Sequence, residues 1–181
     1  KEKTNGNPFF INQFLQVLHD ENMLEFDSTS GWHWDMARIN SMQVTDNVVY
    51  LMASKIDLLP PGTKELLQIG ACFGNRFELE PLSYVAGTSL KETLDNLLYA
   101  LNDGLVGLNQ EFYEFRHDRI QEAAYSMMTP EKRMSTHQRI GRLALQNTPL
   151  EQRNERIFYI VNQLNQGVSL VNDQAEMAQL V

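Results

Sequence analysis

The stretch FYEFRHDRIQEAAY, residues 112–125, joins a strand pattern directly to a helical pattern. Residues 112–115 suit a β-strand, and no loop separates them from the pair His117-Asp118. The apolar side chains that follow share one helical face: Ile120, Ala123, Ala124 and Met127. The pair therefore lies at a strand-to-helix joint. Backbone N–H groups at a helix start lack partners inside the helix and can bind an anion, so we predict that His117 is placed to sense a phosphate.

Residues 63–116, which lead into this joint, predict the order helix, short strand, helix, helix, hairpin. Ser89 and Glu92 form a capping box for the last of these helices. The order is typical of a winged helix, in which a β wing closes a helix-turn-helix. On the outer face of that last helix Lys91 is outweighed by Glu92 and Asp95, and this face would repel DNA phosphates. We therefore interpret the winged helix as a packing module and not as a DNA reader.

The residues before this region predict a helix, a hairpin and a second helix. Asn7 and Pro8 form a helix start, because Asn accepts bonds from orphan N–H groups and Pro needs no donor at the first position. Residues 23–34 alternate in polarity on either side of a turn, which predicts a β-hairpin with aromatic side chains paired across it. Residues 36–43 are expected to form an irregular link, before a helix over residues 48–59.

The final third of the chain is predicted to be helical. Thr129-Pro130 and Thr148-Pro149 each give a helix start, and the two helices would form an αα-hairpin. A third helix is expected near Asn172, so that an array of helical repeats would begin here. The chain is thus predicted to be mainly α-helical with two short β-hairpins, and we expect it to be part of a longer protein.

Composition limits the function classes. The 181 residues are 43% apolar, which is enough to bury a core, and the formal net charge is −8. This charge argues against nucleic acid and anionic membranes as partners, since both need clustered Lys and Arg. Cys72 is the only cysteine and is interpreted as a small buried apolar residue. The sequence has neither a membrane-spanning apolar stretch nor a signal peptide, so membrane insertion is not expected and the predicted compartment is the cytoplasm.

Motifs for catalysis are missing from these residues. There is no Gly-rich loop followed by Lys and Ser or Thr to hold phosphates and magnesium, and there is no G-x-S-x-G elbow. We therefore expect no catalytic residue and no enzyme activity in this segment alone. One alternative is a metal-dependent phosphohydrolase of the His-Asp type, in which His19, His33 and Asp173 would join the His117-Asp118 pair. That dyad belongs inside a helical core, however, whereas this one follows a strand directly.

A structural role for His117 is a second alternative. In this interpretation the imidazole caps or packs the joint and is satisfied by Asp118 or by a backbone carbonyl. Two further features favour a functional role: the triplet Gly6-Asn7-Pro8 near the start of the chain, and the winged-helix order between this triplet and the joint.

With these features together, the chain resembles the C-terminal side of the nucleotide-binding module in signal-transduction ATPases with numerous domains, the STAND class. There a P-loop domain is followed by a helical lid with a Gly-x-Pro motif, a winged helix ending in Met-His-Asp, and a helical-repeat sensor. Gly6 and Pro8 match the first motif and His117 and Asp118 the second, while Arg116 stands where methionine is usual. The resemblance implies that Pro8 packs on the adenine and that His117 bonds the β-phosphate of ADP.

The phrases GNPFF, LLPPGTKELLQIGACFGNRFELEPL, FRHDRIQEAAY and HQRIGRLALQNT also resemble the ATPase region of large bacterial multi-sensor kinases. This likeness implies a lid subdomain over residues 1–59, a winged helix over 60–128 and repeat helices over 129–181. It implies a regulatory nucleotide switch whose partners are an upstream P-loop domain and downstream sensor and kinase domains of the same chain, with self-association as a further hypothesis. ADP or ATP with Mg would bind the full-length protein, and the segment alone would hold no cofactor. A scaffold that binds protein partners without any nucleotide is the alternative.

Overall fold

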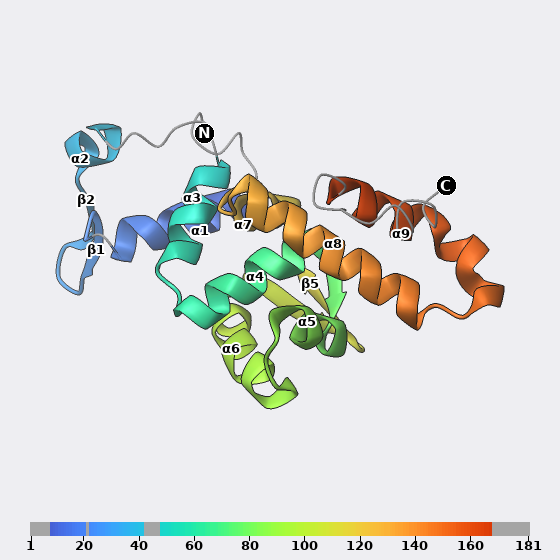
Figure 1. Cartoon of the computed structure of the whole chain (residues 1–181). Coiled ribbons are helices and arrows are strands. Elements are labelled where there is room, and N and C mark those ends of the chain that lie inside the picture. Colours follow the sequence, from blue (N-terminus) through green and yellow to red (C-terminus); the bar gives the residue numbers. More distant parts are fainter. Residues whose placement is uncertain (1–7, 21, 42–47, 168–181) are drawn as a thin grey trace. The chain divides into compact units, whose positions relative to one another are not determined.

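The computed structural model describes residues 8–20, 22–41 and 48–167 (Figure 1). The chain divides into two compact units, residues 1–51 and 52–181, with the boundary inside one helix. The described residues of the chain are mainly helical and carry two small antiparallel sheets, which confirms the predicted fold class at this level.

The first unit contains a helix, a hairpin and a short helix: α1 (Pro8–Asp20), β1 (Leu24–Asp27), β2 (Gly31–Trp34) and α2 (Met36–Ser41). The predicted hairpin is confirmed. Phe26 lies opposite Trp32 in the antiparallel register, and their rings meet edge to face at 5.1 Å between centroids.

Helix α2 corrects the irregular link expected over residues 36–43. Asp35 precedes the helix, and its Oδ1 accepts a hydrogen bond from the N–H of Arg38 at 3.0 Å. This is the geometry of an N-cap, in which a short carboxylate side chain satisfies an orphan amide of the first turn. Asp35 was a helix-start signal in the sequence that the apolar pattern alone did not reveal.

The second unit follows the predicted order of elements. From the boundary helix onward they are α3 (Val48–Asp57), α4 (Pro61–Phe73), β3 (Arg76–Glu78), α5 (Leu79–Ala86), α6 (Leu90–Asn102), β4 (Val106–Asn109), β5 (Phe112–Phe115), α7 (Asp118–Ser126), α8 (Pro130–Asn147), the 3-10 helix Leu150–Gln152 and α9 (Arg153–Gln166). At the N-cap of α6, Ser89 Oγ accepts the N–H of Glu92 at 3.2 Å, which is one of the two bonds of the predicted capping box. None of the described helices has the length and apolar character required to cross a bilayer.

The three short strands of this unit form one antiparallel sheet in the order β3-β5-β4. Strand β5 is central and pairs with a strand on each edge, so the end of β5 at which the joint begins has a neighbouring strand on both sides. Phe77 of β3 lies opposite Tyr113 of β5, and the two rings stack at 5.9 Å between centroids. The pairing of β3 with the β4-β5 hairpin goes beyond the prediction, because three residues are too few to fix a strand partner from their pattern.

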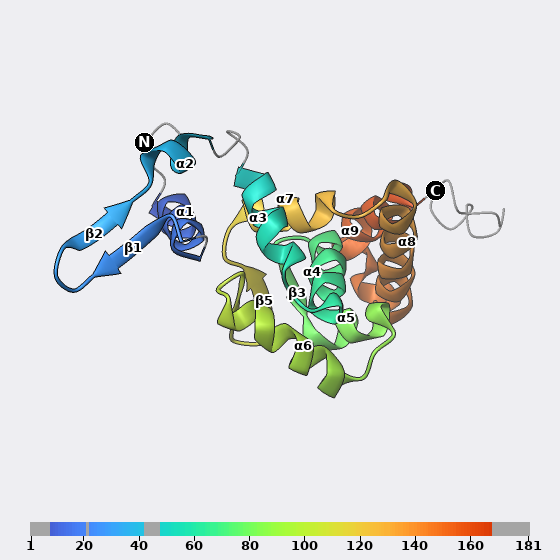
Figure 2. The ribbon, with the colours of Figure 1, turned by 90° about the vertical axis from the view of Figure 1, so that its left-hand side faces the viewer.

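Helix α4 is at the centre of the second unit and packs against α5, α6, α7 and α8 (Figure 2). Its buried residues include Leu66, Leu67, Ile69 and Ala71. Gly70 lies directly under the Phe77 ring, since a Cβ there would be 2.9 Å from Phe77 Cε1. The helix therefore touches the sheet closely on one side and reaches α7 and α8 on the others.

Helices α8 and α9 pack side by side as an αα-hairpin (Figures 1 and 2). Gly141 permits their contact, because a Cβ there would lie 2.6 Å from Cγ of Leu164. Thr148-Pro149 leads into a 3-10 turn, and α9 begins only at Arg153, which corrects the predicted direct helix start. The third helix expected near Asn172 lies outside the described residues.

Candidate functional site

The strand-to-helix joint is fixed on both sides by backbone hydrogen bonds. The N–H of Phe115 donates to the Asn75 carbonyl and that of Arg116 donates to the Leu105 carbonyl, each at 3.0 Å. The backbone of His117 is then extended, and Asp118 is the first residue of α7. The sequence therefore predicted the position of this joint correctly.

The start of α7 is capped by the chain itself. The N–H of Arg119 lies 2.8 Å from Oδ1 of Asp118 and 3.1 Å from Nδ1 of His117, and the N–H of Ile120 donates to the His117 carbonyl at 3.0 Å. Nδ1 of His117 also lies against the Asp118 carboxylate. The expectation that helix-start amides are available to an anion is thus wrong for Arg119 and Ile120. The capping alternative for His117 is confirmed.

The four residues predicted to bind nucleotide have different positions in the structure. Gly6 lies outside the described residues, and Pro8 is the exposed first residue of α1 in the first unit. His117 and Asp118 are adjacent in the second unit, with 26% and 75% of their side chains exposed. Arg116, which stands where the resembling motif has methionine, lies against strand β4, since a Cβ at Gly107 would be 2.7 Å from its guanidinium carbon.

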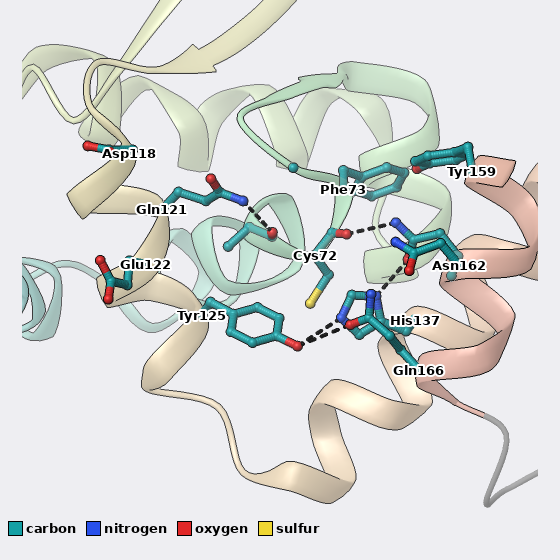
Figure 3. Close-up of a pocket in the computed structure, with 13 residues that line it drawn as sticks. Cys72, Phe73, Asp118, Gln121, Glu122, Tyr125, His137, Tyr159, Asn162 and Gln166 are labelled. Carbon is teal, nitrogen blue, oxygen red and sulfur yellow. Dashed lines mark hydrogen bonds between the residues drawn. The ribbon is translucent and has the colours of Figure 1, made fainter.

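A pocket of about 530 Å³ opens beside the joint, between α7, α8, α9 and the C-terminal end of α4 (Figure 3). Asp118 and Glu122 of α7 lie at one side, and the polar side chains of α8 and α9 lie at the other. The remaining lining groups include Cys72, Gln121, Tyr125, His137, Asn162, Gln163 and Gln166. Polar groups in a concave site are the usual means by which a pocket orients a ligand or fixes a helix junction.

Two glutamine side chains cap the end of α4 from different helices. Nε2 of Gln121 in α7 donates to the Ala71 carbonyl at 3.1 Å, and Nε2 of Gln163 in α9 donates to the Cys72 carbonyl at 3.0 Å (Figure 3). The last carbonyls of a helix have no partner within it, so these bonds satisfy groups that the fold buries.

The same glutamine fixes the tautomer of His137, which is 3% exposed. Since Gln163 donates through Nε2, its Oε1 must be the acceptor that lies 2.6 Å from Nδ1 of His137. Nδ1 therefore carries a proton. In the neutral ring Nε2 is then an acceptor, and the hydroxyl of Tyr125 lies 3.1 Å from it. A chain of bonds, buried at Gln163 and His137 and half-buried at Tyr125, thus connects α4, α9, α8 and α7.

Burial dominates the ionisation of the groups around this chain. Desolvation lowers the pKa of His137, against an opposing hydrogen bond to Gln163, and raises the pKa of Tyr125. Arg133 lies 4.6 Å over the Tyr125 ring and donates to the Tyr125 carbonyl at 3.0 Å. Desolvation also raises the pKa of the Cys72 thiol to about 12, so this free thiol is the small buried residue that the sequence predicted.

We expect acid to destabilise the fold through His137. Its pKa is lowered from the ordinary 6.5, so the unfolded chain binds this proton first as the pH falls. The free energy of unfolding should be constant above pH 6.5 and should fall as the pH drops below 6.5. It should level off once the pH is below the lowered pKa of the folded protein. Each pH unit between the two pKa values removes about 1.4 kcal/mol. Denaturant unfolding of the wild type and of His137→Gln, from about pH 7.5 to about pH 5, checks this; parallel curves for the two proteins would contradict it.

The polar chain was not identified from the sequence. His137 and Gln163 each stand on the apolar face of a predicted helix, three residues from Ile140 and from Ile160. A polar residue at such a position is the signal that could have revealed them, because buried polar side chains require partners. The partners themselves depend on how α4, α8 and α9 meet, which no local pattern contains.

The described residues include no cluster of three or more His, Cys, Asp or Glu side chains with metal-binding geometry. The metal phosphohydrolase alternative also requires Asp173, which lies outside the described residues. It further needs His19 and His33 from the first unit to join the pair in the second unit. This alternative therefore stays untested.

Comparisons with known proteins give one informative result. No family model matches the chain, and no solved structure matches it. The chain is 27% identical over 232 residues to a protein named hybrid signal transduction histidine kinase G, from Dictyostelium discoideum. The match covers 98% of this chain but only 7% of that protein, so the chain spans a small part of its relative. The chain is thus similar to one segment of a signal-transduction kinase, and this similarity supports a signalling context.

Proposed function

We propose that this chain is the lid, winged helix and first repeat helices of a STAND-type regulatory ATPase within a signal-transduction kinase. The lid would span residues 1–59, the winged helix 60–128 and the repeat helices 129–181. The similarity to a histidine kinase supports the kinase context. A bacterial origin and a cytoplasmic location remain predictions.

The winged-helix part of the proposal is supported by the order and pairing of elements. Helix α4, strand β3, helices α5 and α6 and the hairpin β4-β5 follow one another, and β5 lies between β3 and β4. A helix-turn-helix closed by a β wing has this order. The repeat part is supported by the α8-α9 hairpin, the unit from which helical solenoids are built.

The observation that carries the nucleotide role is the fixed position of His117 at the end of the central strand. Its Nδ1 faces Arg119 and Asp118, so a phosphate would have to approach Nε2 on the other side of the ring. The amides of Arg119 and Ile120 are already bonded, and Asp118 is an anion. These residues thus fit one accessory contact and not a phosphate cradle, so an upstream P-loop domain would have to hold ADP or ATP and its Mg. We expect the chain alone to bind nucleotide weakly.

The proposed mechanism is a population shift. Pro8 belongs to the first unit and His117 to the second, so a nucleotide that contacts both would favour one arrangement of the two units. The lid residue would pack against the base, and the His117 side chain would lie against a phosphate of ADP. Loss of that contact would release the winged helix from the arrangement.

In the longer protein that includes the P-loop domain, His117→Ala should weaken ADP retention about tenfold, which corresponds to one lost hydrogen bond to a charged group. His117→Asn is the sharper variant, because Asn keeps the helix cap but removes the imidazole. It should lower ADP affinity equally while leaving the melting temperature unchanged. ADP dissociation is measured with a fluorescent analogue, with the exposed His33→Ala as the control. Wild-type ADP affinity in both His117 variants would exclude the phosphate contact.

A protein-interaction scaffold is the second candidate. The bonded amides at the start of α7 favour it, since His117 already has a structural task there. The two candidates differ in what precedes this segment in the full-length polypeptide. A GxxxxGK[ST] loop upstream supports the nucleotide switch, and its absence supports the scaffold.

A further inference from the structure

Helix α6 carries a second apolar face that the core of its own unit does not use. Its inner face is buried, with Thr93, Leu97 and Ala100 fully enclosed. On the outside, Leu90, Leu94 and Leu98 are spaced at i, i+4 and i+8 and are 46%, 38% and 47% exposed. Scattered exposed leucines are common in soluble proteins, but a continuous row of them marks an interaction surface. We call these three residues the leucine ridge.

The position of the ridge suits contact with another helix. Helix α6 lies at an outer edge of the second unit, apart from the α8-α9 hairpin (Figures 1 and 2). Rows of side chains four residues apart form the ridges that interdigitate in the commonest class of helix packing. The ridge therefore has the spacing of a helix-packing surface, and the partner that fits it is a helix with the same spacing.

Charges along one border of the ridge indicate which helix this is. Lys91 and Asp95 lie one turn apart on the same side of the leucines, and their side chains pair at 2.6 Å. Consider a second copy of α6 that runs antiparallel to the first and is related to it by a two-fold axis near Leu94. The Lys91-Asp95 border of one helix then lies beside the same border of the other helix, with the two residues in reverse order. Lys91 then approaches Asp95 of the second copy and Asp95 approaches its Lys91, while Leu90 lies opposite Leu98. The surface is self-complementary in shape and in charge, as a two-fold interface requires.

We propose that the leucine ridge is a self-association surface, on which α6 of a second copy of this chain docks in antiparallel orientation. The neutral Lys91-Asp95 border suits another copy better than a uniformly basic or acidic partner helix. The inference does not depend on any nucleotide, and none of the ridge residues belongs to the joint at His117. It also explains why α6 presents leucines where a DNA-reading helix would present basic side chains.

The 181-residue chain should show a monomer–dimer equilibrium in sedimentation equilibrium at increasing concentration. Leu94→Glu and Leu98→Glu, which place a charge in the ridge, should each raise the dimer dissociation constant at least about tenfold. Phe158→Glu is the matched control, because Phe158 is an apolar side chain of α9 that is 86% exposed. It should leave the constant unchanged. A chain that stays monomeric at all concentrations, or an equal loss with Phe158→Glu, would overturn the proposal.

Charge exchange at the border tests the antiparallel geometry itself. In Lys91→Glu both residues of the border are acidic, and in Asp95→Lys both are basic. Like charges would then face each other across the dimer, so each variant alone should dimerise less than the wild type. An equimolar mixture of the two should form a heterodimer, since both border pairs then join opposite charges. The double variant K91E/D95K should recover the wild-type constant. Dimers that form in each single variant as readily as in the mixture would show that another surface is used and would overturn the proposal.

Discussion

Gln163→Leu is expected to lower the free energy of unfolding by about 2–4 kcal/mol, although leucine has nearly the same volume. Gln163 is 3% exposed and bonds both the Nδ1 proton of His137 and the carbonyl of Cys72. Leucine leaves both groups buried without a partner, and each unsatisfied group costs about 1–3 kcal/mol. The loss should appear as a lower denaturant midpoint with an unchanged slope.

Asn162→Leu is the matched control for this change. Asn162 is the neighbouring residue on α9, lines the same pocket and is exposed, and the same amide-to-leucine exchange there should alter stability by less than about 0.5 kcal/mol. In a double-mutant cycle with His137→Leu, the two changes should be strongly coupled, because they share one bond. Equal effects of Gln163→Leu and Asn162→Leu, or additive effects in the cycle, would argue against the buried chain of bonds.

Gly141→Ala is expected to destabilise the protein by about 1–3 kcal/mol, despite the higher helix propensity of alanine. The added Cβ would lie 2.6 Å from Cγ of Leu164 and 3.1 Å from its backbone nitrogen. Relief would therefore require α8 and α9 to separate along their whole contact. Thermal unfolding of the 181-residue chain measures the change.

Gly62→Ala provides the comparison within a helix of the same unit. The three atoms nearest to a Cβ there all belong to the side chain of Asn96, with Oδ1 at 2.6 Å, and this amide can turn away from α4 because its hydrogen bond to the Glu92 carbonyl lies at the surface. The gain in helix propensity should then dominate, so that Gly62→Ala is neutral or stabilising by up to about 1 kcal/mol. If Gly141→Ala were equally harmless, the close contact between α8 and α9 would be wrong.

The fold was predictable where local signals are strong. The joint at residues 112–125 combines a strand, a cap and a helical face within one stretch, and the structure contains all three. The β1-β2 hairpin follows likewise from alternation around a turn. Helix α2 is only six residues long, so its apolar period is too short to detect, and only the Asp35 cap marks it. The pairing of β3 with β5 depends on a tertiary contact that three residues do not encode locally.

The candidate site was predictable in position but not in bonding. The sequence identifies His117 and Asp118 as neighbours at a helix start, yet it does not reveal that their side chains occupy the Arg119 amide. The network of His137, Gln163 and Tyr125 joins residues from three helices. The geometry of this network depends on how these helices pack on α4. The only sign of it in the sequence was therefore a single polar residue on each of two apolar helix faces.

The end of α4 also has a mechanical consequence. Two consecutive carbonyls, those of Ala71 and Cys72, are gripped by Gln121 from the helix that begins at the joint and by Gln163 from the last described helix. A force on α7 therefore acts on the peptide unit that follows Ala71, and the next peptide unit of α4, which follows Cys72, is bonded to α9. This connection between α7 and α9 contains no flexible loop. We therefore expect a force applied at the joint to reach α9 with little change in the length of the connection.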